Sequence, residues 1–344
     1  MKKLSINIPS VTHTQSGSAG NILWSIFNET LTISGTGPMS NYHLLDNTRP
    51  PWYIHRNSIT NVIIKEGVNS IGNYGFTGLY GLVSVTIPRS VTTVGCIGFS
   101  GCSSLSVIIN HAVTPQTITS LTFNNVARNT CTLYVPVASI EVYQAASVWK
   151  EFNIKGVIIG KVGKLNWMIF NGTLTITGNG KMPNYEKENS PWTVHHTSFS
   201  NLVIEDGVET IGDYAFWGCR GLLSLSIPNS VTKIGYSAFE GCCNLTNIVI
   251  PGSVNNIGYK SFADCHSLVS VTIPKSVIFI GYGAFKNCNA LTEIINYAGK
   301  PQSVKKVFGK MEISKCVLRV PSTSIITYRF ARGWRGFRIK EILI

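Results

Sequence analysis

The sequence predicts a strand-dominated solenoid with little helix, and three observations lead to this fold class. Four phenylalanines follow one another at one interval of 23 residues: Phe216, Phe239, Phe262 and Phe285. Each lies in a phrase of the same kind, such as IGYSAFEGCCNLTNIVIPGSV from Ile234. The first half of the chain repeats the spacing with Phe76 and Phe99. A fixed period of about 20–29 residues rich in Leu, Ile and Val is typical of leucine-rich-repeat solenoids of the α/β class, whose stacked units share one core.

A larger duplication contains the short repeat. LNWMIFNGTLTITGNGKM from Leu165 echoes ILWSIFNETLTISGTGPM from Ile22. The closing phrases CTLYVPVASIEVYQAASVWKEF and CVLRVPSTSIITYRFARGWRGF match in the same way. At 344 residues the length also favours two domains. We therefore expect two tandem modules behind a flexible N-terminal segment, with the bounds 1–18 (segment), 19–158 (first module) and 159–344 (second module).

Each repeat predicts one short strand and one turn. The pattern L-x-x-V-x-I-P indicates a strand with alternate residues inward, which Pro228 ends in one repeat because proline cannot donate to a ladder. Gly235 is expected to permit a tight bend. The A-F-x-G-C phrase predicts one turn of 3₁₀ or α helix that places Phe239 in the core. Cysteine recurs three residues after the phenylalanine, so we expect packed, reduced thiols rather than disulfides or zinc ligands at five positions: Cys102, Cys219, Cys242, Cys265 and Cys288.

The ends of each module predict caps, because open strand edges promote aggregation. The LTISGTG and LTITGNG phrases indicate strands of β-hairpins, with Trp24 and Trp167 on the preceding strands. The closing segments place an apolar residue at every third position and predict short helices with Ser139 and Ser324 as N-caps. Gly333 weakens the second of these helices, which we expect to be short or irregular.

The composition favours a folded chain. Hydrophobic residues make up 44% and charged residues 13%, which is enough to build a core. No apolar run is long enough to cross a bilayer. Met1–Lys3 would suit the start of a signal peptide, but no apolar stretch follows, so we expect a cytosolic protein or a mature form without its leader.

The net charge of +13 is concentrated in the closing segment. From Lys300 onward, eleven Lys or Arg face two Glu, a net charge of +9 in 45 residues. Four arginines here each follow a residue expected to pack: Arg329, Arg332, Arg335 and Arg338. They would hold anionic glycans, lipid headgroups or acidic protein, or form a solvated face without a ligand. Nucleic acid is not expected, because no nucleic-acid-binding motif accompanies the charge.

Three tyrosines form a second candidate site, each three residues before a repeat phenylalanine: Tyr236, Tyr259 and Tyr282. Tyrosine is enriched at binding hot spots. The alternative is that these rings stack on one another along the solenoid and bind nothing. The outward strand positions, such as Ser226, Val249 and Thr272, are small and uncharged, which suits protein or glycan rather than a phosphate backbone.

No catalytic motif appears, so we expect neither catalytic residues nor a cofactor. His195 and His196 are adjacent, and His55 occupies the place that matches His195. A metal site would need more ligands close by in space, so we favour loop histidines that form local hydrogen bonds after a buried tryptophan.

The phrase I-P-x-S-V-x-x-I-G-x-x-A-F-x-G-C-x-x-L resembles the BspA-type leucine-rich repeat of bacterial surface proteins. It is legible in IPNSVTKIGYSAFEGCCNL from Ile227 and IPRSVTTVGCIGFSGCSSL from Ile87, and the resemblance covers most of residues 20–344. It departs at Leu79, where other repeats carry Cys. The resemblance implies export, display at the cell surface and adhesion to host proteins.

Together these observations predict a non-catalytic, secreted or cell-surface binding protein. It would contact a protein or glycan outside the cell through the extended solenoid face, as a monomer without a transmembrane segment. The alternatives are a structural spacer within a longer surface protein, or a carbohydrate-active or peptide-cleaving enzyme.

Overall fold

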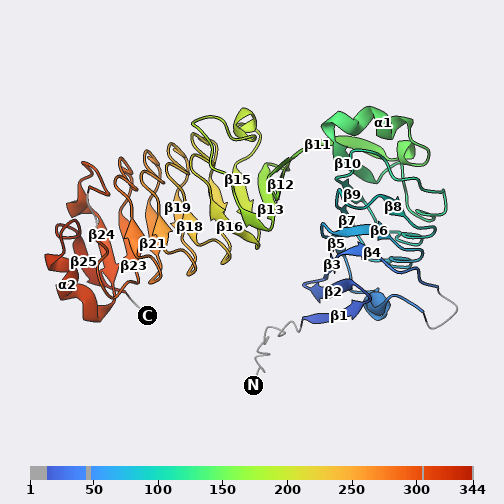
Figure 1. Ribbon diagram of the computed structural model, residues 1–344, viewed down its shortest axis with the longest axis horizontal. Coiled ribbons are helices and arrows are strands. Elements are labelled where there is room, and N and C mark those ends of the chain that lie inside the picture. The colour runs from blue at the N-terminus through green and yellow to red at the C-terminus, as the bar shows by residue number, and fades with distance from the viewer. Residues whose placement is uncertain (1–13, 44–47, 304–305, 343–344) are drawn as a thin grey trace, which may run out of the picture. The chain divides into compact units, whose positions relative to one another are not determined.

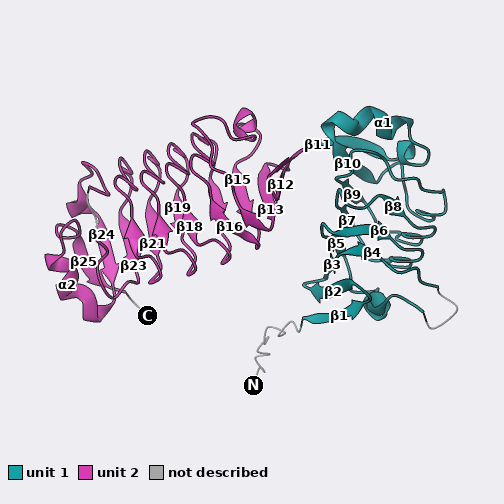
Figure 2. Cartoon of the chain, viewed as in Figure 1, with its two compact units in different colours: residues 1–157 teal, residues 158–344 magenta. Residues whose placement is uncertain are grey.

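The computed structural model describes residues 14–43, 48–303 and 306–342. The chain divides into two compact units, Met1–Val157 and Ile158–Ile344 (Figure 2). Each unit is a solenoid of stacked, strand-dominated repeats (Figure 1), which confirms the predicted fold class. Most of the predicted N-terminal segment 1–18 lies outside the described residues, and Gln15–Ala19 form the first strand.

Unit 1 contains two sheets. The first has the order β1-β2-β3-β5-β7-β9-β10-β11 and the second β4-β6-β8. The elements are β1 (Gln15–Ala19), β2 (Ile22–Phe27), β3 (Thr30–Gly35), β4 (Gly37–Pro38), β5 (Asn61–Ile64), β6 (Val68–Ile71), β7 (Ser84–Ile87), β8 (Thr93–Val94), β9 (Val107–Asn110), β10 (Thr132–Pro136), α1 (Ile140–Ala145) and β11 (Asn153–Val162). Residues of β11 pair with β10 up to Val157 and with β12 from Ile158 onward.

Unit 2 repeats this plan with more repeats. One side of the unit carries two sheets, β12-β13-β15-β17 and β19-β21-β23-β24-β25, with β17 close to β19, and the second sheet position is taken by β14-β16-β18-β20-β22. The elements are β12 (Leu165–Phe170), β13 (Thr173–Gly178), β14 (Gly180–Lys181), β15 (Asn201–Ile204), β16 (Val208–Ile211), β17 (Ser224–Ser226), β18 (Lys233–Ile234), β19 (Asn247–Val249), β20 (Asn256–Ile257), β21 (Ser270–Ile273), β22 (Phe279–Ile280), β23 (Glu293–Asn296), β24 (Val317–Val320), α2 (Ile325–Phe330) and β25 (Arg338–Glu341).

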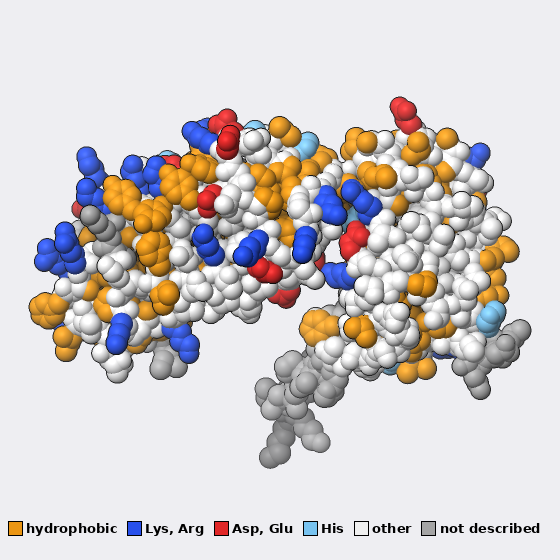
Figure 3. All heavy atoms as spheres, viewed as in Figure 1, with side chains coloured by type: hydrophobic (Ala, Val, Ile, Leu, Met, Phe, Trp, Pro, Cys, Tyr) orange, Lys and Arg blue, Asp and Glu red, His pale blue; other side chains and the backbone are white. Residues whose placement is uncertain are grey.

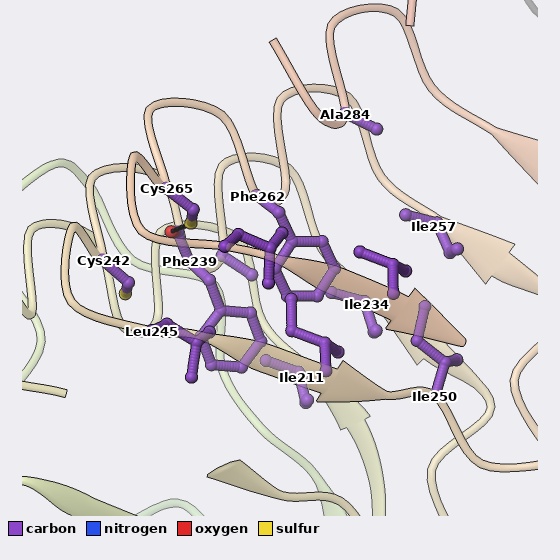
Figure 4. Packing of buried hydrophobic residues seen from close by; sticks show 14 of the residues in the cluster. Ile211, Ile234, Phe239, Cys242, Leu245, Ile250, Ile257, Phe262, Cys265 and Ala284 are labelled. Atoms are coloured by element: carbon purple, nitrogen blue, oxygen red, sulfur yellow. Dashed lines mark hydrogen bonds between the residues drawn. The ribbon is translucent and has the colours of Figure 1, made fainter. Parts of the chain in front are cut away.

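A column of stacked phenylalanines forms the centre of each unit. In unit 2 the ring centroids of Phe239 and Phe262 are 5.2 Å apart with planes nearly parallel, at 1°. The column continues through Phe285 to Phe308, and a tryptophan lies at either end, Trp192 and Trp334. The predicted recurrence of phenylalanine is therefore a physical stack, and each ring is buried by the repeats on both sides (Figure 4).

The repeat cysteines are free, buried thiols, as predicted. Four of them, Cys102, Cys242, Cys265 and Cys288, each donate a weak hydrogen bond to the carbonyl of the phenylalanine in the preceding repeat, as the Cys265 Sγ does to Phe239 O at 3.3 Å (Figure 4). Burial raises the pKa of the Cys219 and Cys288 thiols to about 12. Leu79 takes the cysteine position in the first repeat of unit 1 and is equally buried.

The A-F-x-G-C phrase is a turn, and the predicted turn of helix is wrong. Alternate backbone N–H groups donate to the next repeat, as Phe239 N does to Ser261 O at 2.7 Å, and are therefore not free for a helical ladder. Left-handed residues also bound the turn, such as Ser237 (φ 49°) and Gly241 (φ 79°). A helix cannot continue through such residues.

Gly235 is required for a different reason from the one predicted. Its φ is not positive, so no left-handed bend depends on it. A Cβ at the equivalent Gly258 would lie 2.4 Å from the carbonyl oxygen of Gly235, and one at Gly281 would lie 2.4 Å from the backbone nitrogen of Tyr259. These glycines therefore let the backbones of successive repeats touch.

The caps follow the prediction in outline. Hairpins β2–β3 and β12–β13 begin the two units. Helices α1 and α2 close them and are only six residues long, because the residue that follows each helix is extended: Ala146 (ψ 134°) and Ala331 (ψ 127°). Ser139 and Ser324 occupy the predicted N-cap positions, but neither side chain makes a capping hydrogen bond. The Ser324 hydroxyl instead donates to Gly299 O at 2.9 Å.

A buried amide pair joins each closing segment to the last repeat, and the sequence reasoning missed it. Asn296 Nδ2 donates to Gln302 Oε1 at 2.9 Å, and Gln302 Nε2 donates to Val277 O at 3.0 Å. Trp334 Nε1 then donates to Gln302 O at 2.9 Å. Unit 1 has the same arrangement. The recurrence of IINHAVTPQ as IINYAGKPQ was the available signal.

Candidate binding surfaces

Of the predicted loop histidines, His196 makes the expected local hydrogen bond, with Nδ1 2.9 Å from Thr193 O. His55 and His195 instead end short 3₁₀ helices and lie against the rings of Trp24 and Trp167. Within the described residues no group of three or more His, Cys, Asp or Glu side chains gathers closely enough to hold a metal ion.

Strands β15, β17, β19, β21, β23, β24 and β25 of unit 2 present a regular outward surface, which we call the strand face. Its register aligns Asn201 with Ser224, and Asn247 with Ser270. In each pair the serine hydroxyl donates to the asparagine side-chain oxygen, at 2.6 Å and 2.8 Å. A neighbouring column contains Ser226 and then the aligned residues Val249, Thr272 and Ile295. Val249 is 70% exposed. The strand face is therefore uncharged over β15–β21, as predicted.

The strand face becomes charged at β23–β25. Arg319 Nε donates to Glu293 Oε1 at 2.6 Å, and the register places Lys340 beside Arg319 and Arg338 beside Val317. Cationic side chains on the last strand of a sheet also disfavour pairing with another chain.

The four predicted arginines lie on different elements. Arg329 belongs to α2, Arg332 and Arg335 follow it, and Arg338 begins β25. All four are exposed, and each follows a residue that packs. They do not form a stripe along one helix, because α2 ends at Phe330.

The three predicted tyrosines occupy consecutive repeats but differ in surroundings. Tyr236 is half-buried, and its ring centroid is 5.2 Å from that of Tyr214. Tyr259 and Tyr282 are exposed, and Tyr259 contacts Phe279 at 5.7 Å. Among the described residues, Tyr236 and Tyr259 therefore make ring contacts with Tyr214 and Phe279, which are not among the three predicted tyrosines.

An apolar patch on the second sheet escaped the sequence reasoning. We define it as Tyr259, Ile278, Phe279 and Tyr282. Ile278 is 78% exposed and Phe279 36% exposed, although both come from a repeat whose core is fully packed. The signal lay in comparing repeats. The two positions are polar in five other repeats, as Asn69-Ser70, Thr92-Thr93, Glu209-Thr210, Thr232-Lys233 and Asn255-Asn256.

In the part of the chain that the structure describes, no helix combines the length and apolar character needed to cross a bilayer.

The repeats match a known protein family. The family model "BspA type Leucine rich repeat region" matches six copies over residues 52–177 and 193–331. A comparison with curated protein sequences gives no match.

Several solved structures resemble the chain at low identity. A leucine-rich repeat protein from Eubacterium ventriosum is 19% identical, with 94% of this chain and 91% of that chain covered and a TM-score of 0.32. The pneumococcal vaccine antigen PcpA is 15% identical, with 96% and 99% covered and a TM-score of 0.39. A leucine-rich repeat protein from T. pallidum is 21% identical, with 53% and 97% covered and a TM-score of 0.35.

The family match extends over most of the sequence and coincides with the stacked phenylalanines, the thiols and the close-packed glycines described above. The chain therefore belongs to the BspA-type leucine-rich repeat family.

Proposed function

We propose that the protein is a non-catalytic binding protein that acts outside the cell and holds a protein or glycan on its strand face. The observation that carries this proposal is the regular outward surface of β15–β21, where serine and asparagine side chains alternate and Val249 stands exposed. Such a surface offers hydrogen bonds over several strands without strong charge, so it complements neutral protein or sugar surfaces.

The proposal that the protein is exported is based on its family. BspA-type repeats are typical of bacterial surface proteins, and the buried thiols do not depend on disulfide formation in any compartment. The predicted tyrosines and arginines remain candidate secondary contacts, with Arg329, Arg332, Arg335 and Arg338 as the cationic set.

A binding screen with the intact chain tests the proposal. The immobilised protein is exposed to purified extracellular-matrix proteins and to a glycan array, and saturable binding at about micromolar protein is expected. Val249→Glu places a charge in the middle of the strand face and is expected to weaken the ligand about tenfold or more.

Phe330→Ala is the matched control, because this side chain is 82% exposed and lies on α2. It is expected to bind like the wild type. Absence of any saturable ligand, or equal binding by Val249→Glu, would refute the strand face as the binding surface, and absence of any ligand would favour the structural spacer.

A further inference from the structure

We propose that the apolar patch of unit 2 is a docking site for an acidic polypeptide segment that carries apolar anchor residues. This inference deepens the proposed function by naming a second surface and the chemistry of its partner. It is argued from the placement of Tyr259, Ile278, Phe279 and Tyr282, and from the charge that surrounds them.

The four side chains lie on adjacent repeats. Backbone bonds place the tyrosines one repeat apart, because Lys260 N donates to Tyr282 O at 3.0 Å. Gly281 brings the two backbones into contact, since its Cβ would lie 2.4 Å from Tyr259 N. The Phe279 ring then contacts the ring of Tyr259, at 5.7 Å and 53°. Tyr259 and Phe279 are thus in contact, Ile278 is the neighbour of Phe279 in the sequence, and Tyr282 lies on the adjacent repeat.

This exposure is not required by the fold. The repeat that carries Asn255 and Asn256 at the same two positions has an equally buried core. The register aligns Phe279 with Asn256 and, one repeat further, with Lys233. Ile278 is therefore left in water at a position that is polar in other repeats, and Phe279 remains partly exposed beside Tyr259. Exposed apolar residues that the fold does not require are typical of an interaction site.

The surroundings of the patch are cationic. Between Asp264 and Glu312 the sequence has six lysines and one acidic residue, Glu293. Glu293 lies on the other sheet and is bonded to Arg319. The one carboxylate between Tyr259 and Tyr282 is Asp264, which accepts from Asn287 Nδ2 at 2.7 Å, so lysines outnumber carboxylates in this part of the chain.

Two of these lysines, Lys286 and Lys306, lie close to the backbone beside Tyr282, and so does Lys260 of the preceding repeat. Gly283 follows Tyr282, and a Cβ built on it would lie 3.5 Å from Cγ of Lys260 and 3.7 Å from Cβ of Lys286. Gly283 N donates to Lys306 O at 3.2 Å. Figure 3 shows hydrophobic side chains gathered on unit 2 with Lys and Arg side chains beside them.

Charge complementarity therefore selects the occupant. Rings and an exposed isoleucine need an apolar partner, and the lysines need carboxylates within the same segment. An acidic polypeptide with leucine or aromatic anchors supplies both. A sulfated or sialylated glycan supplies the charge but has no group that would cover Ile278, which is 78% exposed.

The experiment is a selection from phage-displayed random peptides on the intact wild-type protein. Enriched peptides are expected to be rich in Asp and Glu and to contain Leu, Phe or Trp. Binding of synthetic copies is then measured against the double variant Ile278→Asn/Phe279→Asn. This variant copies Asn255-Asn256 of the preceding repeat and so retains a sequence that the fold already accepts.

We expect the double variant to bind these peptides about tenfold or more weakly, and Phe330→Ala to bind them like the wild type. Phe330 is 82% exposed on α2, so this variant controls for loss of exposed apolar surface elsewhere. Affinity is also expected to fall as salt rises from about 0.1 M to about 1 M, because the screening length shrinks from about 10 Å to about 3 Å.

Other outcomes overturn the inference. The first is that the enriched peptides have no excess of Asp and Glu, and the second is that the double variant binds them as tightly as the wild type. The third is that the double variant loses binding to a sulfated glycan such as heparin but still binds the peptides. The proposed function fails separately. If a matrix ligand binds the double variant normally but does not bind Val249→Glu, the result supports the strand face and counts against the patch. If acidic peptides are selected but no extracellular ligand is found, the result supports the patch and counts against the strand face.

Discussion

Replacing Phe262 by alanine tests the stack at the centre of unit 2. Phe262 is fully buried, and its ring lies 5.2 Å from that of Phe239 and 5.6 Å from that of Phe285. Alanine would leave a cavity between two repeats whose backbones are tied together on both sides by hydrogen bonds, so the gap has little freedom to collapse.

The expected loss in the free energy of unfolding is about 3–5 kcal/mol. A typical domain has only about 5–15 kcal/mol in total, so unit 2 would lose about a fifth or more of its stability. Phe262→Leu keeps most of the buried apolar area but removes two ring pairs, each of about 0.5–1.5 kcal/mol. It should therefore cost about 1–3 kcal/mol.

Labelling of buried thiols measures the stability of the two units separately. Cys242 lies in the core of unit 2 and Cys102 in the core of unit 1, and both are fully buried. Thiol labelling at increasing urea, read by mass spectrometry, gives the free energy of exposing each. Phe262→Ala should lower the value at Cys242 and leave that at Cys102 unchanged, because the cores are separate.

Phe330→Ala is the control for this series, since an exposed ring should change stability by no more than about 0.5 kcal/mol. A loss below about 1 kcal/mol at the Cys242 thiol for Phe262→Ala would refute the stack as a source of stability.

Three further predictions concern thiols, acid and close packing. In the folded protein at pH 8, a thiol reagent should react fastest at Cys96 and Cys243, since these two are half-buried and the other seven cysteines are buried; mass mapping identifies the sites, and early labelling elsewhere would contradict the packing. Burial lowers the pKa of His111 to about 4, so the unfolded chain gains this proton first as pH falls from about 6.5 to about 4. His111→Gln should therefore reduce the loss of unit 1 stability over that window, measured by urea unfolding at several pH values, and an unchanged pH profile would speak against it. Gly258→Ala should destabilise unit 2 by about 1–3 kcal/mol because its Cβ would meet the preceding backbone at 2.4 Å, whereas Gly252→Ala, with nothing within 4 Å, should not; equal melting temperatures would disprove the close approach.

The repeated features were predictable because stacking makes spacing in the sequence equal to position in space. Phe262 and Cys265 recur at the interval that brings them over Phe239 and Cys242, so composition and period were sufficient to predict their burial. The hairpins and short helices followed from the duplication of whole end segments.

Features that depend on contacts between repeats were beyond this reasoning. The turn around Phe239 satisfies the A-F-x-G-C pattern of a helix start, but its N–H groups donate to the next repeat. Ser324 occupies the N-cap position, but its hydroxyl bonds to Gly299 O. Propensity describes a segment alone, and here the neighbouring repeat determines which partner a polar group finds.

The candidate sites show the same limit. Tyr259 was predicted from its place in the repeat, but the side chain it contacts, Phe279, lies in the next repeat and breaks the polar pattern of its column. A search for recurring residues does not find Phe279, because its importance comes from the fact that it differs from the residues at the same position in other repeats.

The uniform bonding from one repeat to the next has a consequence for how the family varies. The thiol of Cys242 reaches the carbonyl of Phe216 as that of Cys265 reaches Phe239, at 3.3 Å in both cases. Recombination that deletes residues 231–253 would remove one whole repeat and join two surfaces that already fit such neighbours. Duplication of one repeat would lengthen the solenoid by about 4.8 Å. Length is thus free to drift in whole steps while both terminal segments keep their own chemistry.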